Sequence, residues 1–236
     1  MRKALVALAI AAAAVPMVLG VIELPRPGDP SAPALTHVAA RYIESGAQEA
    51  GADNLVTGVL LNYRGLDTFG EVMVIFSALA AVMATLAGVP SAAVPRAVRE
   101  AIPISPVVAY IIRLTAPFIA LFGAYVIFKG HITPGGGFQG GVILGALLVL
   151  LSVVLGRGSA TPLLPVSAAR CLQAAGPVTF AVIGAAGLAL TGALLGFPQD
   201  PALAHLRESM LIALEIGIGL GGAFIILGLF EVMRGD

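Results

Sequence analysis

Charged residues, cysteine and tryptophan are all scarce in this sequence. Its 236 residues include 13 Lys and Arg and 13 Asp and Glu, so charged residues make up 11% of the chain, about half the share in a soluble globular protein. The formal net charge is zero, and the lack of a dense basic patch argues against nucleic acid as a partner. Cys171 is the single cysteine, which excludes an intramolecular disulfide and a thiolate metal cage. Tryptophan is absent, so an aromatic belt at a membrane interface would have to come from tyrosine and phenylalanine.

Apolar residues are abundant and lie in long runs. They make up 58% of the chain and give it a mean hydropathy of +1.00. A run of about 20 apolar residues is long enough to cross a bilayer as a helix, and helices satisfy their own backbone polar groups in lipid. The sequence therefore predicts an all-α, polytopic membrane protein with about six transmembrane helices. The six predicted spans are 4–22, 69–87, 107–128, 138–155, 178–197 and 210–232.

The first run follows a basic start of Arg2 and Lys3, a pattern that also suits a secretory signal peptide. We favour a retained anchor, because the run is almost long enough to span and residues 16–20 offer no clean small-x-small cleavage site.

The polar stretch that follows the first run opens with four prolines, which predict an extended segment outside the membrane. Residues 35–50 predict a short surface helix, and residues 54–61 a return towards the bilayer. A linker at 91–106, rich in proline and arginine, is the clearest boundary in the chain. We expect a two-helix module at 1–90 and a four-helix domain at 107–236.

Lysine and arginine in short loops predict the orientation. With the N-terminus in the cytoplasm, seven of these residues fall inside and five outside, so N-in and C-in is favoured. The inside set is Arg2, Lys3, Arg96, Arg99, Arg157, Arg170 and Arg234, and the outside set is Arg26, Arg41, Arg64, Lys129 and Arg207.

Five charged residues lie at or within the predicted spans, and one of them, Glu231 at the end of the last span, is expected to be a solvated helix end. Asp67 and Glu71 stand four residues apart at the start of the second span, hence on one helix face. Glu215 lies in the last span, and Arg113 in the third. A charge in hydrocarbon costs several kcal/mol unless it is paired or hydrated. Two interpretations stay open for the carboxylates: a proton or cation relay, or an ion pair that fixes helix packing. Arg113 is the candidate charge partner.

A glycine-rich loop is the most unusual local feature. It lacks the Lys-Ser/Thr pair of a phosphate-binding loop, so we expect a structural role. Pro134 suits a helix start, the glycines permit a sharp turn, and glycines spaced by four give a flat helix face for close packing. The residues assigned to this loop and face are Pro134, Gly135, Gly136, Gly137, Gly140, Gly141 and Gly145.

The three histidines, His37, His131 and His205, fall in predicted loops without the clustered spacing of a zinc site. His131, beside the glycine-rich loop, is the candidate proton-exchanging group. No nucleophile–base signature occurs. The sequence therefore predicts a non-catalytic protein with no cofactor or metal of its own.

Two stretches resemble known families. Residues 130–143 (GHITPGGGFQGGVI) and 214–219 (LEIGIG) are similar to the MnhB domain, the B-type component of Mrp-type multi-subunit cation/proton antiporters, which also occurs in membrane-bound hydrogenases and related respiratory complexes. Residues 54–71 resemble the C-terminal end of the large, A-type antiporter component, a segment that in membrane-bound hydrogenases is a separate small protein of E type.

The resemblance implies a membrane protein that stands beside antiporter-like pumping subunits, contributing to Na⁺ and proton translocation and to assembly. It implies the cell inner membrane of a prokaryote, an ion path through Asp67 and Glu71 in the N-terminal module, and roles for His131 and Glu215 in the B-type domain. Two alternatives stay open. One is a purely structural scaffold in the same complex with no titrating group, and the other, less favoured, is a stand-alone carrier.

Overall fold

The computed structural model describes residues 2–86, 104–156 and 165–234. Within these ranges every regular element is a helix, which confirms the predicted all-α class. Contacts divide the chain into two compact units, residues 1–44 and 45–236. Most of the predicted linker at 91–106 lies outside the described residues.

Within the described parts of the chain, five helices are long and apolar enough to cross a membrane. They are α1 (Arg2–Ile22), α5 (Gly65–Leu86), α7 (Pro106–Phe128), α8 (Gly137–Leu155) and α11 (Ala204–Arg234). A sixth candidate span is the pair formed by α9 (Val166–Gln173) and α10 (Ala175–Thr191), which meet at a bend of 53°. The prediction of a multi-pass membrane protein is confirmed, and the side on which each terminus lies stays a prediction.

The proline-rich stretch after α1 forms turns, so the prediction of an extended segment was wrong. The hydroxyl of Ser31 donates to the Asp29 carboxylate at 2.6 Å and its backbone N–H at 2.8 Å, and these bonds hold the pKa of Asp29 below its usual value. The predicted surface helix is present as α2 (Pro33–Thr36) and α3 (Val38–Ala50), with a break at His37.

The segment leading into α5 is a compact helical turn. It begins with α4 (Leu55–Thr57), which Asn54 caps by accepting the N–H of Val56, and it continues as a π-helical turn at Gly58–Tyr63. Thr68 then donates its hydroxyl to Leu60 O at 2.7 Å and ties the turn to α5. Because this turn is continuous with α5, the helix begins at Gly65, four residues before the predicted span.

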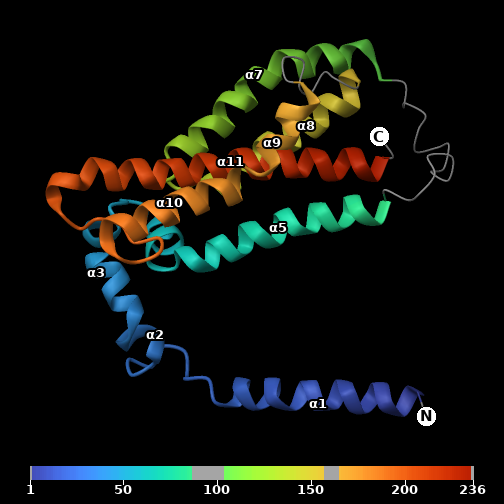
Figure 1. Cartoon of the computed structure of the whole chain (residues 1–236). Helices are drawn as coiled ribbons and strands as arrows, with labels where there is room; N and C mark the ends of the chain where they lie inside the picture. The colour runs from blue at the N-terminus through green and yellow to red at the C-terminus, as the bar shows by residue number, and fades with distance from the viewer. Residues whose placement is uncertain (1, 87–103, 157–164, 235–236) are drawn as a thin grey trace. The chain divides into compact units, whose positions relative to one another are not determined.

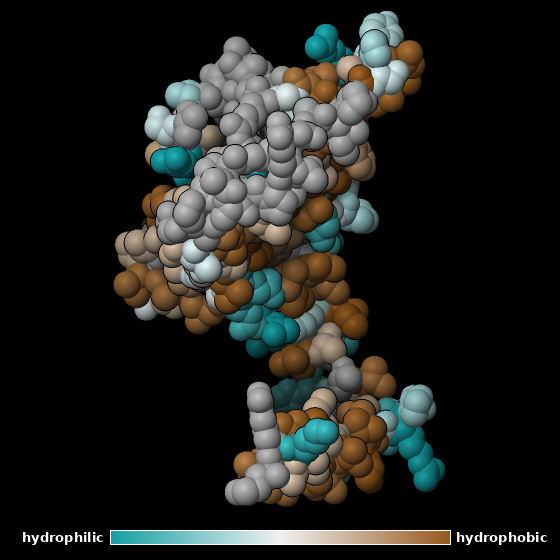
Figure 2. Space-filling model, turned by 90° about the vertical axis from the view of Figure 1, so that its right-hand side faces the viewer, coloured by the Kyte–Doolittle hydropathy of each residue, from teal (hydrophilic) through white to brown (hydrophobic). Residues whose placement is uncertain are grey.

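The last helix is the centre of the larger unit. The most apolar window of α11 is 67% buried, against at most 28% in α1, α5, α7 and α8. α11 contacts α5, α7, α8, α9 and α10 (Figure 1). The outer helices leave large apolar side chains exposed, as on α7, where Phe118 and Leu121 are about 70% accessible. Figure 2 shows apolar residues over much of the visible surface. This surface suits lipid or neighbouring membrane proteins.

Glycines bring α8 and α10 close to opposite sides of α11. A Cβ built on Gly141 of α8 would lie 2.9 Å from Gly219 O, and one built on Gly145 would lie 2.9 Å from the Ile226 side chain. On the α10 side, a Cβ on Gly221 would lie 2.9 Å from Gly176 N. These are close approaches that any larger residue would push apart.

Other helix ends also differ from the predicted ones. α10 ends at Thr191, not at 197, because Gly192 takes a left-handed conformation (φ 77°) and closes the helix with a bond to Leu188 O. α11 begins at Ala204, six residues before the predicted span, because its first turns are polar and extend beyond the apolar run. α8 begins at Gly137, so Pro134 lies in the preceding turn and not at the helix start as predicted.

Candidate ion-translocation site

Glu215 is the carboxylate that the structure encloses. It lies in the middle of α11 with 3% of its surface exposed. One carboxylate oxygen, Oε1, accepts a hydrogen bond from the Thr57 hydroxyl at 3.1 Å, and the other, Oε2, accepts the backbone N–H of Gly137. The partners come from α4 and from the first residue of α8, so three separate segments meet at this side chain.

The carboxylate takes the place of a helix cap. The N-cap residue of α8 is Gly136, which has no side chain to accept the free N–H groups of the first turn. Glu215 accepts one of them from the neighbouring helix. The N-terminus of a helix also carries partial positive charge, which favours a nearby carboxylate. The position of Glu215 therefore stabilises the start of α8 and gives its negative charge a partner.

Two glycines leave room for the carboxylate. A Cβ built on Gly130 would lie 2.6 Å from Gly136 Cα and 3.0 Å from Glu215 Oε1. Gly136 has φ 136°, which side chains rarely adopt, and its Cβ would lie 3.1 Å from Glu215 Oε2. The glycine-rich loop thus wraps the acid group with backbone alone.

Asn54 and Thr57 form a second polar layer around the site. Asn54 Nδ2 donates to Gly130 O at 2.7 Å and to Thr133 O at 3.0 Å, and its backbone N–H donates to His131 O. The Thr57 hydroxyl lies 2.8 Å from Gly130 O and 3.1 Å from Glu215 Oε1. It has one proton for these two acceptors, so it donates to one at a time.

A small cavity adjoins the acid. Its volume is about 30 Å³, and its lining combines Thr57, Thr68, the loop glycines, Gln139 and Glu215 with the apolar side chains of Val56, Leu60, Leu61, Phe138 and Ile218. A cavity volume of only ~10–15 Å³, with polar groups to bond to, is enough to hold a water molecule. The cavity is therefore large enough to hydrate the carboxylate.

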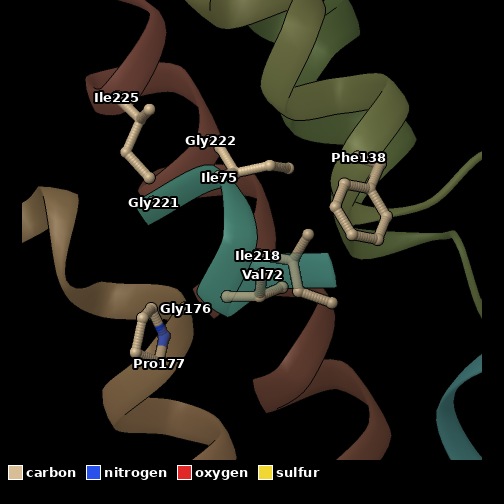
Figure 3. A pocket seen from close by; sticks show the side chains of 9 residues that line it. All are labelled: Val72, Ile75, Phe138, Gly176, Pro177, Ile218, Gly221, Gly222 and Ile225. Carbon is tan, nitrogen blue, oxygen red and sulfur yellow. The ribbon is translucent and has the colours of Figure 1, made fainter. Parts of the chain in front are cut away.

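A second pocket, almost wholly apolar, lies where α5, α8, α10 and α11 meet (Figure 3). The side chains of Phe138 and Ile218 line both this pocket and the cavity beside Glu215. They form an apolar wall between this pocket and the cavity beside Glu215.

His131 lies beside this site but faces another acid. It is 5% exposed, and its Nε2 is 3.3 Å from Glu208 Oε1. Its other ring nitrogen, Nδ1, is buried without a hydrogen-bond partner among the described residues. Glu208 is 44% exposed and also lies 3.9 Å from His205. His131 is therefore a buried residue, not the ordinary loop residue that the other two histidines resemble.

The remaining predicted site residues lie apart from Glu215. Asp67 is about half exposed and pairs with Arg64 at 2.6 Å. Glu71, one turn further along α5, and Arg113 on α7 are exposed, and neither has a hydrogen bond or ion pair to another residue in the described ranges. The structure therefore does not pair Arg113 with Glu71 or with Glu215. Within the same ranges no group of three or more His, Cys, Asp or Glu could hold a metal ion.

Residues 107–229 match the family described as "Domain related to MnhB subunit of Na+/H+ antiporter". This match covers more than half of the chain. The chain belongs to the MnhB family. Residues 2–94 match a second family, MbhE, described as the E subunit of MBH. In this MnhB-family protein, Glu215 and Gly137 come from the first matched region and Thr57 from the second, so the site forms where the two regions meet.

Relatives of known name are antiporter subunits. The chain is 30% identical over 113 residues to the B subunit of the Na(+)/H(+) antiporter of Bacillus subtilis, covering 46% of this chain and 78% of that one. It is 26% identical over 136 residues to the A/B subunit of a probable K(+)/H(+) antiporter of Rhizobium meliloti, covering 48% of this chain and 13% of that one. An uncharacterised protein of Methanocaldococcus jannaschii is 30% identical over 49% of this chain. The chain spans about half (47%) of that protein's length.

Two solved complexes contain chains of the same fold. One is the membrane-bound sulfane sulfur reductase, an archaeal respiratory membrane complex, with a TM-score of 0.70, 28% identity and coverage of 98% of this chain and 97% of that one. The other is the Mrp complex from Dietzia sp., with a TM-score of 0.69, 25% identity and coverage of 100% of this chain and 26% of that one. The MnhB-family chain is thus homologous to subunits of both kinds of complex.

Asn54, Thr57 and Glu208 are polar residues around these sites that the sequence did not single out. Asn54 and Thr57 give no periodic signal, because they lie 161 and 158 positions before Glu215. Glu208 did leave one signal. It stands seven residues before Glu215, two turns back on the same face of α11.

Proposed function

We propose that this chain is a non-catalytic membrane subunit of a multi-subunit cation/proton antiporter module, and that Glu215 takes part in moving protons or cations. The parent complex is either a Mrp-type antiporter or the ion-pumping arm of a membrane-bound hydrogenase-like respiratory complex, with Na⁺ and H⁺ as the proposed ions. The proposed location is the plasma membrane of a prokaryote. Other membrane subunits of the same complex are the proposed partners.

One observation supports this proposal most. Glu215 combines a nearly complete enclosure in the central helix with hydrogen-bond donors, and it borders a cavity with room for water. Acidic residues inside membrane spans are costly and usually mark ion or proton paths. We also propose that Asp67 and Glu71 belong to an ion path through the N-terminal module. Both side chains are exposed on the surface of α5.

The variant Glu215→Gln distinguishes a transport role of this residue from a purely structural one. The amide is nearly isosteric: its oxygen can accept the Gly137 N–H, and its nitrogen can donate to the Thr57 hydroxyl, whose own proton then goes to Gly130 O. The cap of α8 is kept while the charge is lost. We expect normal amounts of assembled complex and loss of cation-dependent proton movement in inverted membrane vesicles.

Glu231→Gln is the matched control, because Glu231 is an exposed acid near the other end of the same helix. It should leave transport unchanged. If Glu215→Gln transports as well as the control, Glu215 has no titrating role and the scaffold alternative holds. Glu215→Leu should instead reduce assembly, because it leaves the Gly137 N–H without an acceptor, at a cost of about 1–3 kcal/mol.

Affinity purification in mild detergent distinguishes the two parent complexes. Recovery of antiporter subunits together with iron–sulfur or hydrogenase subunits would support a redox-driven pump, and recovery of antiporter subunits alone would support a Mrp-type exchanger. A protein recovered by itself would contradict the proposal that it belongs to a complex.

A further inference from the structure

Glu208 and His131 make a second acid–base pair at the polar end of α11. Glu208 is 44% exposed, whereas the His131 side chain is 6% exposed, and 3.3 Å separate Glu208 Oε1 from His131 Nε2. The pair therefore joins a group in contact with solvent to a group that is closed off from it. Among the residues that the structure describes, His205 is the other titratable group in contact with this pair; it lies 3.9 Å from Glu208 and is fully exposed.

The buried ring has an unused polar atom. His131 Nδ1 is enclosed and has no hydrogen-bond partner among the described residues. A buried polar nitrogen without a partner costs free energy. A histidine held only for packing would gain from an apolar replacement, so the free nitrogen points to a transient partner such as water or a proton-carrying group.

His131 is joined to the Glu215 site through its own backbone. Its carbonyl accepts the Asn54 N–H, and the preceding carbonyl of Gly130 accepts from Asn54 and Thr57. Thr57 in turn reaches Glu215 Oε1. Glu208 and Glu215 stand seven residues apart on α11, about 10 Å along the helix axis. The two acids therefore lie two helical turns apart on the same face of α11.

We infer that Glu208 and His131 form the surface end of a proton path that leads to Glu215. The inference rests on the proposed function of Glu215. Glu208 takes a proton from bulk water and passes it to Nε2 of His131. The ring releases its other proton, from Nδ1, to a water molecule that protonates the Glu215 carboxylate. One proton enters and one leaves, so Glu208 and the ring keep their charge, and the ring regains its first tautomer before the next transfer.

The test uses the complete complex in native membrane vesicles. Glu208→Gln keeps a side chain that can bond to His131 but cannot carry a proton, and His131→Gln removes the ring while keeping a polar group. Glu231→Gln and His37→Gln are the matched controls, since both change exposed residues. The readouts are the amount of assembled complex and the initial rate of cation-driven proton movement at rising concentrations of an impermeant buffer, placed on each side of the membrane in turn.

Both variants should lower the initial rate by about 10-fold, which is less than the 10²–10⁴-fold that a positioned general acid or base typically contributes. Rising buffer should restore much of the rate in Glu208→Gln, because mobile buffer replaces the lost surface acceptor. The wild type and the controls should not respond to buffer. A purely structural role would not produce this rescue.

Each other outcome overturns the inference. It fails if Glu208→Gln and His131→Gln transport at the control rate, or if the slower rate of Glu208→Gln does not respond to buffer on either side. Where Glu208→Gln fails to assemble, the rate of His131→Gln decides, and where His131→Gln fails to assemble, the rate and buffer response of Glu208→Gln decide. Loss of the complex in both variants assigns the pair a structural role. Glu215→Gln, measured in parallel, distinguishes the two proposals: if it stops transport while both variants at the pair are normal, only the surface end is wrong.

Discussion

Gly141→Ala tests whether the close approach of α8 to α11 holds the fold together. The new methyl group would lie 2.9 Å from Gly219 O and 3.2 Å from Gly219 Cα, both backbone atoms that cannot rotate away. Such overpacking costs about 1–3 kcal/mol. Alanine also favours a helix over glycine by about 0.8–1.0 kcal/mol, so the net loss is smaller than the steric cost.

Gly222→Ala on α11 is the matched control. A Cβ at Gly222 meets nothing within 4 Å, so this variant gains the helix preference without the clash. The two alanine variants should differ in free energy of unfolding by the full steric cost. For a chain of this length, about 1–3 kcal/mol corresponds to a difference in Tm of ~2–12 °C.

Thermal unfolding of the purified full-length chain in one detergent, followed by circular dichroism, measures this difference. Gly141→Ala should unfold below the wild type and Gly222→Ala at or above it. If Gly141→Ala were as stable as Gly222→Ala, α8 and α11 would not be in backbone contact at this position. The glycine face would then need another explanation.

Two further predictions concern the site and the orientation. Thr57→Val keeps the shape of the side chain but removes the hydroxyl that contacts Glu215 and Gly130. The variant should lower the transport rate several-fold while the complex still assembles. A transport rate equal to that of the wild type would exclude a role for this hydroxyl in transport. In a Cys171→Ser background, an impermeant maleimide should label Ala202→Cys from outside intact cells and Met233→Cys only in inverted vesicles. The opposite labelling would refute the N-in, C-in orientation.

The spans could be predicted from the sequence because lipid imposes a length on apolar runs, but the helix ends could not. Hydropathy continues through Leu194, Leu195 and Phe197, whereas the helix stops at Thr191. The stop depends on the backbone of Gly192, which hydropathy does not register. At the start of α11 the opposite happens, because a helix can extend beyond the membrane as a polar segment.

The candidate site was only half predictable for a related reason. Glu215 was recognisable, because an acid within an apolar run is unusual wherever it points. Its partners were not, since they depend on which segments the fold brings together. Arg113 shows the same limit: its predicted depth resembles that of Glu215, but its side chain faces away from the helix bundle. The depth of a residue in the membrane follows from its position in the span, whereas the direction of its side chain depends on how the helix is rotated about its axis.

The fold alone does not explain why residue 215 is an acid and not a neutral residue. The start of α8 needs an acceptor for the Gly137 N–H, and the loop glycines leave room for a planar group of this size. A glutamine would meet both needs without the cost of a charge in a membrane span. The fold therefore accounts for the shape and the acceptor oxygen of residue 215 but not for its acidity. We propose that this acidity serves proton transfer, because a water-sized cavity adjoins the carboxylate and Glu208, two turns back on α11, contacts the buried His131.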